Sequence, residues 1–260
     1  MRGNKTAVWQ NGTGQEIVFD NRTFFLEDID MTGTAGIHTV ETLARADGQV
    51  SIAHQLAAKT IPCSFAWYDS TQEDDYMREK LTQLFNPLMS GTLTVYTREN
   101  VYAIDCYPQD FPVFKRVSGL PVWRWEVDFI ADYPYWRKGT ERHAALSELP
   151  VNNLGQHYLM SSCPFAIAPN IYLPASASDN WFAISGKGMT IHNHENNAII
   201  IKAGTLEVVT ADTGEECNYL IDAQYAIESL RINYGKNLVT YGGSANGVLL
   251  SYYNLSMGEV

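Results

Sequence analysis

The stretch from Val122 to Trp136 reads VWRWEVDFIADYPYW, and it has the clearest strand pattern in the chain. Apolar and charged residues alternate without a break from Trp123 to Phe129. Successive side chains of a strand point to opposite faces of a sheet, so this alternation predicts one packed face and one solvated face. The alternation ends before Pro134, which cannot continue a central ladder. We therefore interpret the closing aromatic residues as the end of a domain rather than as a binding platform.

Most of the chain on either side of this stretch also predicts strands. Short apolar runs rich in β-branched and aromatic residues are separated by Gly, Asn and Asp, as in AVWQN, QEIVF, RTFFLEDID and QVSIAHQLAAKTIPCSFAWYD. The runs GTLTVYT and VYAIDCY flank residues 98–100, which predicts a hairpin with a short loop. The fold class that we expect is therefore mainly β with one helix, a β-rich α+β protein.

The single helix is predicted just after residue 70. Ser70 precedes Glu73 at the spacing of a capping box. Apolar residues then recur at helical intervals, with charged residues mostly on the other side: Met77, Leu81, Leu84 and Leu88. Pro87 and Gly91 are expected to end the helix.

A change of character after Trp136 predicts a domain boundary. The segment RKGTERHAALSELPVNN is polar and lacks periodicity, so we place one domain at residues 1–140 and a second at residues 141–260. Short strands with turn signals follow, which is typical of an antiparallel β-sandwich. We expect turns at residues 202–204, at residues 234–237 and in SGKGM, which lacks the pattern of a phosphate-binding loop.

Composition narrows the classes of function. Hydrophobic residues make up 45% of the chain and charged residues 18%, which indicates a folded protein. The net charge of −11 disfavours sequence-specific binding of DNA or RNA, because the surface repels phosphate. No apolar run approaches the length needed to insert in a membrane. Four widely spaced cysteines, Cys63, Cys106, Cys163 and Cys217, are expected to be buried free thiols.

Few residues suggest catalysis or a metal site. His192, His194 and Glu195 are a candidate metal cluster, but the surrounding asparagines favour a polar turn. Asp28 and Asp30 resemble half of a calcium loop without its remaining ligands. Asp128 and Asp132 are the best candidates for the pair of carboxylates that a glycoside hydrolase needs, yet Asp128 belongs to the solvent-exposed face of a strand. We therefore predict no catalytic residue, no metal and no cofactor.

A sugar-binding function is a more credible alternative than catalysis. Aromatic faces near carboxylates and amides stack on pyranose rings and bind their hydroxyl groups. Trp181, Tyr252 and Tyr253 are the candidate sugar contacts. The competing interpretation is that each of them fills a sandwich core. A carbohydrate-binding β-sandwich that recognises host cell-wall sugars thus remains an alternative function.

Taken in order, these features resemble the distal tail proteins of long-tailed, siphovirus-type bacteriophages, which belong to the phage tail hub family. The resemblance covers RADG, the helix ending LTQLFNPLMSGTL, the strand ending DFIADYPYW and the block GTLEVVTADTGEECNYLID. The signature that closes the N-terminal domain in that family is matched here by five residues: Phe129, Asp132, Pro134, Tyr135 and Trp136.

The resemblance implies a structural protein of the virion tail tip that is not an enzyme. The N-terminal domain would form a hexameric ring with copies of itself, and the C-terminal, galectin-like domain would surround that ring. The ring would join the tail tube and the tape-measure protein to tail-tip, baseplate and receptor-binding proteins, after assembly in the bacterial host cytoplasm. Genomic DNA would pass through the ring, so we expect an acidic channel. Some relatives carry a large inserted sugar-binding module, for which 260 residues leave no room.

Overall fold

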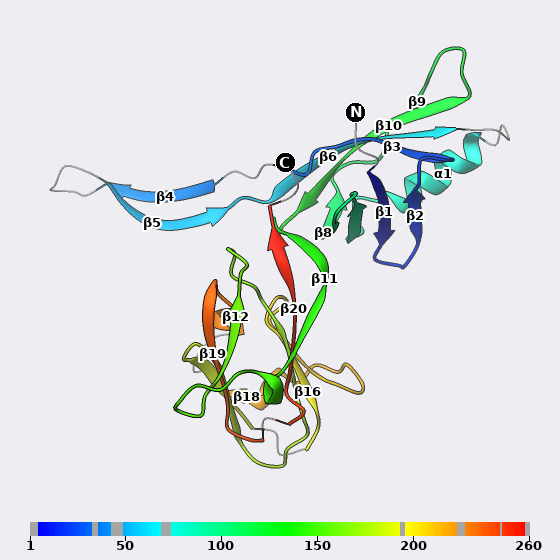
Figure 1. Ribbon diagram of the computed structural model, residues 1–260. Helices are drawn as coiled ribbons and strands as arrows, with labels where there is room; N and C mark the ends of the chain where they lie inside the picture. The colour runs from blue at the N-terminus through cyan, green and yellow to red at the C-terminus, as the bar shows by residue number, and fades with distance from the viewer. Residues whose placement is uncertain are drawn as a thin grey trace. The chain divides into compact units, whose positions relative to one another are not determined.

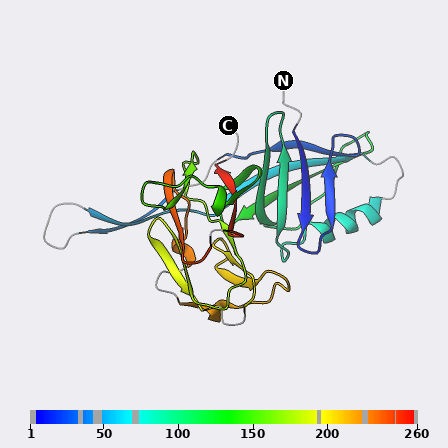
Figure 2. The ribbon, with the colours of Figure 1, turned by 60° about the horizontal axis from the view of Figure 1, so that its bottom comes forward.

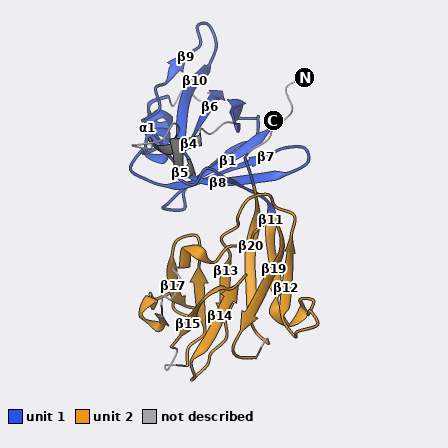
Figure 3. Ribbon diagram, turned by 90° about the vertical axis from the view of Figure 1, so that its left-hand side faces the viewer, with its two compact units in different colours: residues 1–139, 256–260 blue, residues 140–255 orange. Residues whose placement is uncertain are grey.

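The computed structural model in Figure 1 describes residues 5–32, 36–42, 49–68, 74–192, 196–222, 227–244 and 246–257. The chain divides into two compact units (Figure 3). Unit 1 comprises Met1–Gly139 with Ser256–Val260, and unit 2 comprises Thr140–Leu255. The chain enters unit 2 within β11 (Trp136–Ala145) and returns to unit 1 at the end of β20 (Leu249–Ser256). The sequence had placed residues 141–260 together, whereas the residues from Ser256 onward group with unit 1.

Unit 1 is built from antiparallel strands and the one described α-helix. One set of strands has the order β2-β1-β7-β8, and its members are β1 (Thr6–Asn11), β2 (Glu16–Phe19), β7 (Gly91–Tyr96) and β8 (Val101–Pro108). The other has the order β3-β6-β10 with β9 beside β10, and its members are β3 (Phe24–Ile29), β6 (Lys59–Tyr68), β9 (Lys115–Arg116) and β10 (Val122–Ala131). A separate two-stranded sheet pairs β4 (Gly36–Thr42) with β5 (Gln49–Leu56). The expected hairpin around residues 98–100 is confirmed, since β7 pairs with β8.

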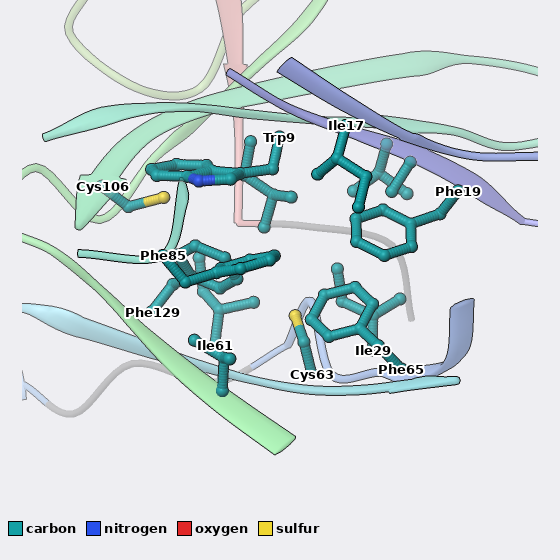
Figure 4. Close-up of a cluster of buried hydrophobic side chains, with 14 of the residues drawn as sticks. Trp9, Ile17, Phe19, Ile29, Ile61, Cys63, Phe65, Phe85, Cys106 and Phe129 are labelled. Atoms are coloured by element: carbon teal, nitrogen blue, oxygen red, sulfur yellow. The ribbon is translucent and has the colours of Figure 1, made fainter. Parts of the chain in front are cut away.

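The core of unit 1 is aromatic, as Figure 4 shows. The rings of Phe19 and Phe65 stack with centroids 4.2 Å apart. The ring centroids of Trp9 and Phe129 are 4.8 Å apart, and those of Phe85 and Phe129 are 6.0 Å apart. Along β10, buried and exposed residues alternate from Arg124 to Phe129. The prediction of one packed face and one solvated face is therefore confirmed for this strand.

The helix α1 spans Asp74–Leu84 and lies alongside β1 and β2 (Figures 1 and 2). Leu81 and Leu84 are buried and Met77 packs against the core, as predicted. The placement of Leu88 on the packed face was wrong, because the helix ends at Leu84 and Leu88 is 91% exposed. Phe85, fully buried just after the helix, occupies the core instead. The predicted capping residues Ser70 and Glu73 lie outside the described residues.

Unit 2 consists of two antiparallel sheets, as expected of a β-sandwich. One has the order β12-β19-β14-β15-β18, and its members are β12 (His157–Ser161), β14 (Asn180–Ile184), β15 (Lys187–Ile191), β18 (Ile221–Asp222) and β19 (Gly235–Tyr241). The other has the order β17-β16-β13-β20 followed by β11, and its further members are β13 (Asn170–Leu173), β16 (Ile199–Lys202) and β17 (Glu207–Thr210). Three short 3-10 segments complete the unit: η1 (Leu146–Glu148), η2 (Asn218–Leu220) and η3 (Ile227–Ser229).

Two of the three turns predicted in unit 2 are confirmed. The strands β16 and β17 form a hairpin across the turn after Lys202, and β14 and β15 form another across Ser185 and Gly186, which both have positive φ. The turn predicted at residues 234–237 was wrong, because residues 235–237 belong to β19, which pairs with β12 and β14. The Asn237 side chain bonds to the backbone of Asn233 and thereby holds the preceding segment in a local polar loop.

All four cysteines are buried and free, as predicted. Burial raises the pKa of the Cys63 and Cys106 thiols, which keeps both of them protonated and unreactive. No helix among the described residues combines the length and the hydropathy that a membrane span requires.

Candidate functional site

The closing residues of VWRWEVDFIADYPYW fall into two groups. Phe129, Pro134 and Trp136 are buried, and Trp136 is completely so. The indole nitrogen of Trp136 donates a hydrogen bond to the carbonyl of Met31 at 3.2 Å. These three side chains therefore belong to the packing of unit 1.

The remaining signature residues lie at or near the surface. Asp132 is exposed and accepts a long hydrogen bond of 3.5 Å from the Tyr107 hydroxyl. Tyr135 is half-buried, and its ring lies 5.0 Å from that of the half-exposed Tyr133. An exposed carboxylate beside paired aromatic rings suits a contact with another protein, because aromatic side chains are enriched at such interfaces.

A buried lysine holds the C-terminal end of the described chain in unit 1. Lys59 at the start of β6 is completely buried, and its Nζ donates to the carbonyl of Met257 at 2.7 Å. Desolvation lowers the pKa of Lys59, and the charge of Asp30 partly opposes that effect. Lys59 alternates with the buried Ile61 and Cys63, so this parity was the available signal that its side chain points inward.

The aspartates considered for calcium form local turns. Asp30 accepts hydrogen bonds from the backbone and the hydroxyl of Thr32, and these bonds lower the pKa of its carboxyl group. Asp28 accepts a bond from the backbone of Ile29 at 3.0 Å. Each carboxylate thus accepts a hydrogen bond from a backbone N–H group close to it in the sequence.

Of the candidate metal cluster, only His192 belongs to the described part of the chain, and His194 and Glu195 lie outside it. The Nδ1 atom of His192 is 2.9 Å from a carboxylate oxygen of Asp179. Among the residues that the structure describes, no three His, Cys, Asp or Glu side chains converge as metal ligands.

The hollow that Asp128 lines does not include Asp132, the other candidate hydrolase residue. This hollow has a volume of about 390 Å³, and Asp110 and Glu126 also line it. Trp125 also lines this hollow, and its buried indole nitrogen has no hydrogen-bond partner within the described chain. Glu126 and Asp128 belong to the exposed face of β10, as the alternation of this strand predicts, and Asp110 follows β8.

The three candidate sugar contacts are spread over both sheets of unit 2. Trp181 is half-buried on β14, whereas Tyr252 and Tyr253 are neighbours on β20 and therefore point to opposite sides. Tyr252 is 7% exposed and lines a pocket of about 520 Å³, to which Trp181 and Tyr253 do not contribute. The pocket also receives Arg142, His143 and Glu148, which sequence reasoning missed because their segment reads as a polar linker.

The fold of this chain, with its two units of antiparallel strands and the aromatic core of unit 1, is similar to that of solved bacteriophage tail hub and baseplate proteins. Over 97% of this chain and 99% of the other, the structure is similar to the Dit protein of phage SPP1, described as a paradigm of the hub adsorption apparatus in Gram-positive-infecting phages, with a TM-score of 0.66 and 12% identity. Chains of the phage P2 baseplate in its activated conformation, with Ca and with Sr, match with a TM-score of 0.61 and 9% identity, over 98% of this chain and 99% of the other. No protein-family model and no curated protein matches the sequence. The resemblance deduced from the sequence is thus confirmed for the fold.

Proposed function

We propose that this protein is a distal tail protein of a long-tailed bacteriophage and acts as the structural hub of the tail tip. The observation that carries the proposal is the match to a hub protein over 97% of this chain and 99% of that one. A match across both units includes the whole architecture and not one common β domain. In this role the protein is a component of the virion, assembled in the host cytoplasm, and it needs neither catalytic residues nor a cofactor.

In this proposal unit 1 forms a hexameric ring, and unit 2, as a galectin-like domain, surrounds it. Open strand edges support self-assembly, because an unpaired edge accepts a strand from another chain. Among the described strands, β2 pairs only with β1, and β4 and β5 pair only with each other. Exposed apolar side chains such as Phe111, Val113 and Leu120 add surface suited to protein contacts.

The partners follow from the place of a hub in the tail. One side of the ring contacts the tail tube and the tape-measure protein, and the other contacts tail-tip, baseplate and receptor-binding proteins. The net charge of −11 supports a channel that lets DNA pass without retaining it, because phosphate meets like charge along the bore. A ring with a net basic bore would contradict this part of the proposal.

The oligomeric state tests the proposal directly. Light scattering after size-exclusion chromatography of the full chain, with negative-stain imaging, should detect a ring with six times the chain mass of 29.1 kDa. Assembly is concentration-dependent, so the measurement includes high protein concentration and the addition of the tail-tube protein from the same genome. A protein that stays at 29.1 kDa under both conditions would refute the hub.

A further inference from the structure

The pocket beside Tyr252 is a site that the hub role leaves unexplained. It lies within unit 2, where the second half of β11 and η1 meet β12 and β20, and it has a volume of about 520 Å³. This volume is within the range of small-molecule sites. Its floor includes the buried side chains of Leu159 and Tyr252. Its rim carries three exposed polar side chains: Arg142, His143 and Glu148.

The walls of the pocket are fixed by the fold. The backbone of Leu146 in η1 donates to the carbonyl of Val248 at 2.9 Å, and the Leu146 side chain is completely buried. Leu149 continues from η1 into the lining, held by a hydrogen bond from its backbone to the Leu146 carbonyl. A site with pre-formed walls loses little conformational entropy when it binds a ligand.

The polar groups at the pocket have unused bonding capacity. Tyr252 is 7% exposed, and its hydroxyl has no hydrogen-bond partner among the described residues. Arg142 and Glu148 form no ion pair within the described chain, and His143 has only a contact of 4.0 Å to Glu141. A tyrosine hydroxyl that bonds to no protein group is free to donate to and accept from a ligand.

The chemistry of the lining defines the ligand class. An apolar floor suits C–H groups, while Arg142 supplies donors and Glu148 supplies acceptors for hydroxyl groups. An anion would meet Glu148 and a cation would meet Arg142, so the rim favours a neutral molecule that both donates and accepts. We propose that unit 2 binds a neutral saccharide unit in this pocket, through Arg142, Glu148 and the hydroxyl of Tyr252. This inference is independent of the hub role, since a ring subunit either has or lacks such a site.

Saturation-transfer NMR and titration calorimetry on the full chain test the inference. The probes are glucose, galactose, rhamnose, N-acetylglucosamine and the disaccharides of glucose, with inorganic phosphate as an anionic competitor. At least one saccharide should bind, and phosphate should neither bind nor displace it. Arg142→Ala and Glu148→Gln should each weaken binding at least tenfold, and Tyr252→Phe, which removes only the hydroxyl, should weaken it about threefold.

A control variant and a fallback make the outcome unambiguous. Tyr234→Phe removes a hydroxyl from an exposed tyrosine of unit 2 outside the pocket and should leave affinity unchanged. If Tyr252→Phe fails to fold, the two exposed rim variants decide the question. Absence of saccharide binding, binding that all three pocket variants retain, or displacement by phosphate would each overturn the inference. The variants should assemble as the wild type does, so failure of the hub proposal would appear separately in the particle mass.

Discussion

Lys59 is the only buried charged residue among the residues that the structure describes. A lysine is tolerated in an apolar interior when its ammonium group finds an acceptor, and here the Met257 carbonyl fulfils that need. The bond joins residues that are 198 positions apart, at the place where the chain returns to unit 1. Lys59 therefore fastens the last described residues to the first unit.

We expect Lys59→Ala to lower the free energy of unfolding by about 2–4 kcal/mol, because it leaves a cavity and an unpaired carbonyl. Lys59→Met keeps most of the volume and should cost about 1–2 kcal/mol at neutral pH. Urea unfolding monitored by fluorescence measures both variants. Equal stability of Lys59→Ala and the wild type would show that the bond to Met257 contributes nothing.

The pH dependence of this pair has a definite sign. The pKa of Lys59 is lower in the folded protein than in the unfolded chain, so unfolding takes up a proton at pH values between the two. The stability of the wild type relative to Lys59→Met should therefore rise as the pH increases from the lowered folded value towards 10.5. Unfolding series on both proteins across this window provide the measurement. A constant or falling difference would contradict the assigned direction.

Trp136 offers a direct test of the domain-end interpretation. Trp136→Ala should cost about 3–5 kcal/mol, because a completely buried ring is lost. Trp136→Phe retains most of the ring and loses the bond to Met31, which should cost about 1–2 kcal/mol beyond the small change in packing. Thermal unfolding by circular dichroism ranks the variants. Unchanged stability with loss of a ligand interaction would instead identify a binding residue.

At the scale of elements, α1 depends on packing more than on its own sequence. Asp75, Glu79 and Lys80 are exposed, while Asp74 accepts a hydrogen bond from the Trp123 indole nitrogen at 3.1 Å. Leu81 is 1% exposed and packs against the aromatic core. The Trp9 indole donates to the Leu84 carbonyl at 3.0 Å and so satisfies one of the free carbonyls at the helix end. A helix of 11 residues is marginal in isolation, so these tertiary contacts stabilise it.

Leu81→Ala should therefore lower the free energy of unfolding by about 2–5 kcal/mol, because it opens a cavity under the helix. Tyr76→Ala is the matched control, since Tyr76 lies in the same helix and is 64% exposed. It should change stability by less than about 0.5 kcal/mol. Denaturant unfolding of the two variants gives the comparison. Similar losses for both would mean that helix propensity, and not packing, determines the stability of α1.

Strands with strict alternation were predictable, whereas one loop was not. The pattern from Trp123 to Phe129 is compatible with only one pairing register of the strand, because a shift of the register by one residue would bury Arg124 and Glu126. The segment before Gly235 carries a similar but weaker alternation. There the Asn237 side chain forms hydrogen bonds with the Asn233 backbone, and these bonds replace hydrogen bonds to a neighbouring strand. The alternation in the sequence does not indicate this competing interaction.

For the whole molecule, the two units should unfold in separate steps. Trp181 is the only tryptophan in unit 2, and the other five lie in unit 1. In Trp181→Phe, tryptophan fluorescence reports unit 1 alone, while far-UV circular dichroism reports both units. We expect the two signals to give different midpoints in urea, because two cores joined by short strand segments are separate cooperative units. Coincident transitions would show that the chain unfolds as one.

The sequence by itself determined the β-rich class, the single helix and the closing role of VWRWEVDFIADYPYW, because strand alternation and Pro134 act locally along the chain. Only the tertiary structure decided which distant groups meet. It paired Lys59 with Met257, seated Trp136 on Met31, and brought Arg142 and Glu148 to the rim above Tyr252. The physical reason is that periodicity specifies which face of an element is buried, whereas the neighbour on that face depends on how all the strands pack together.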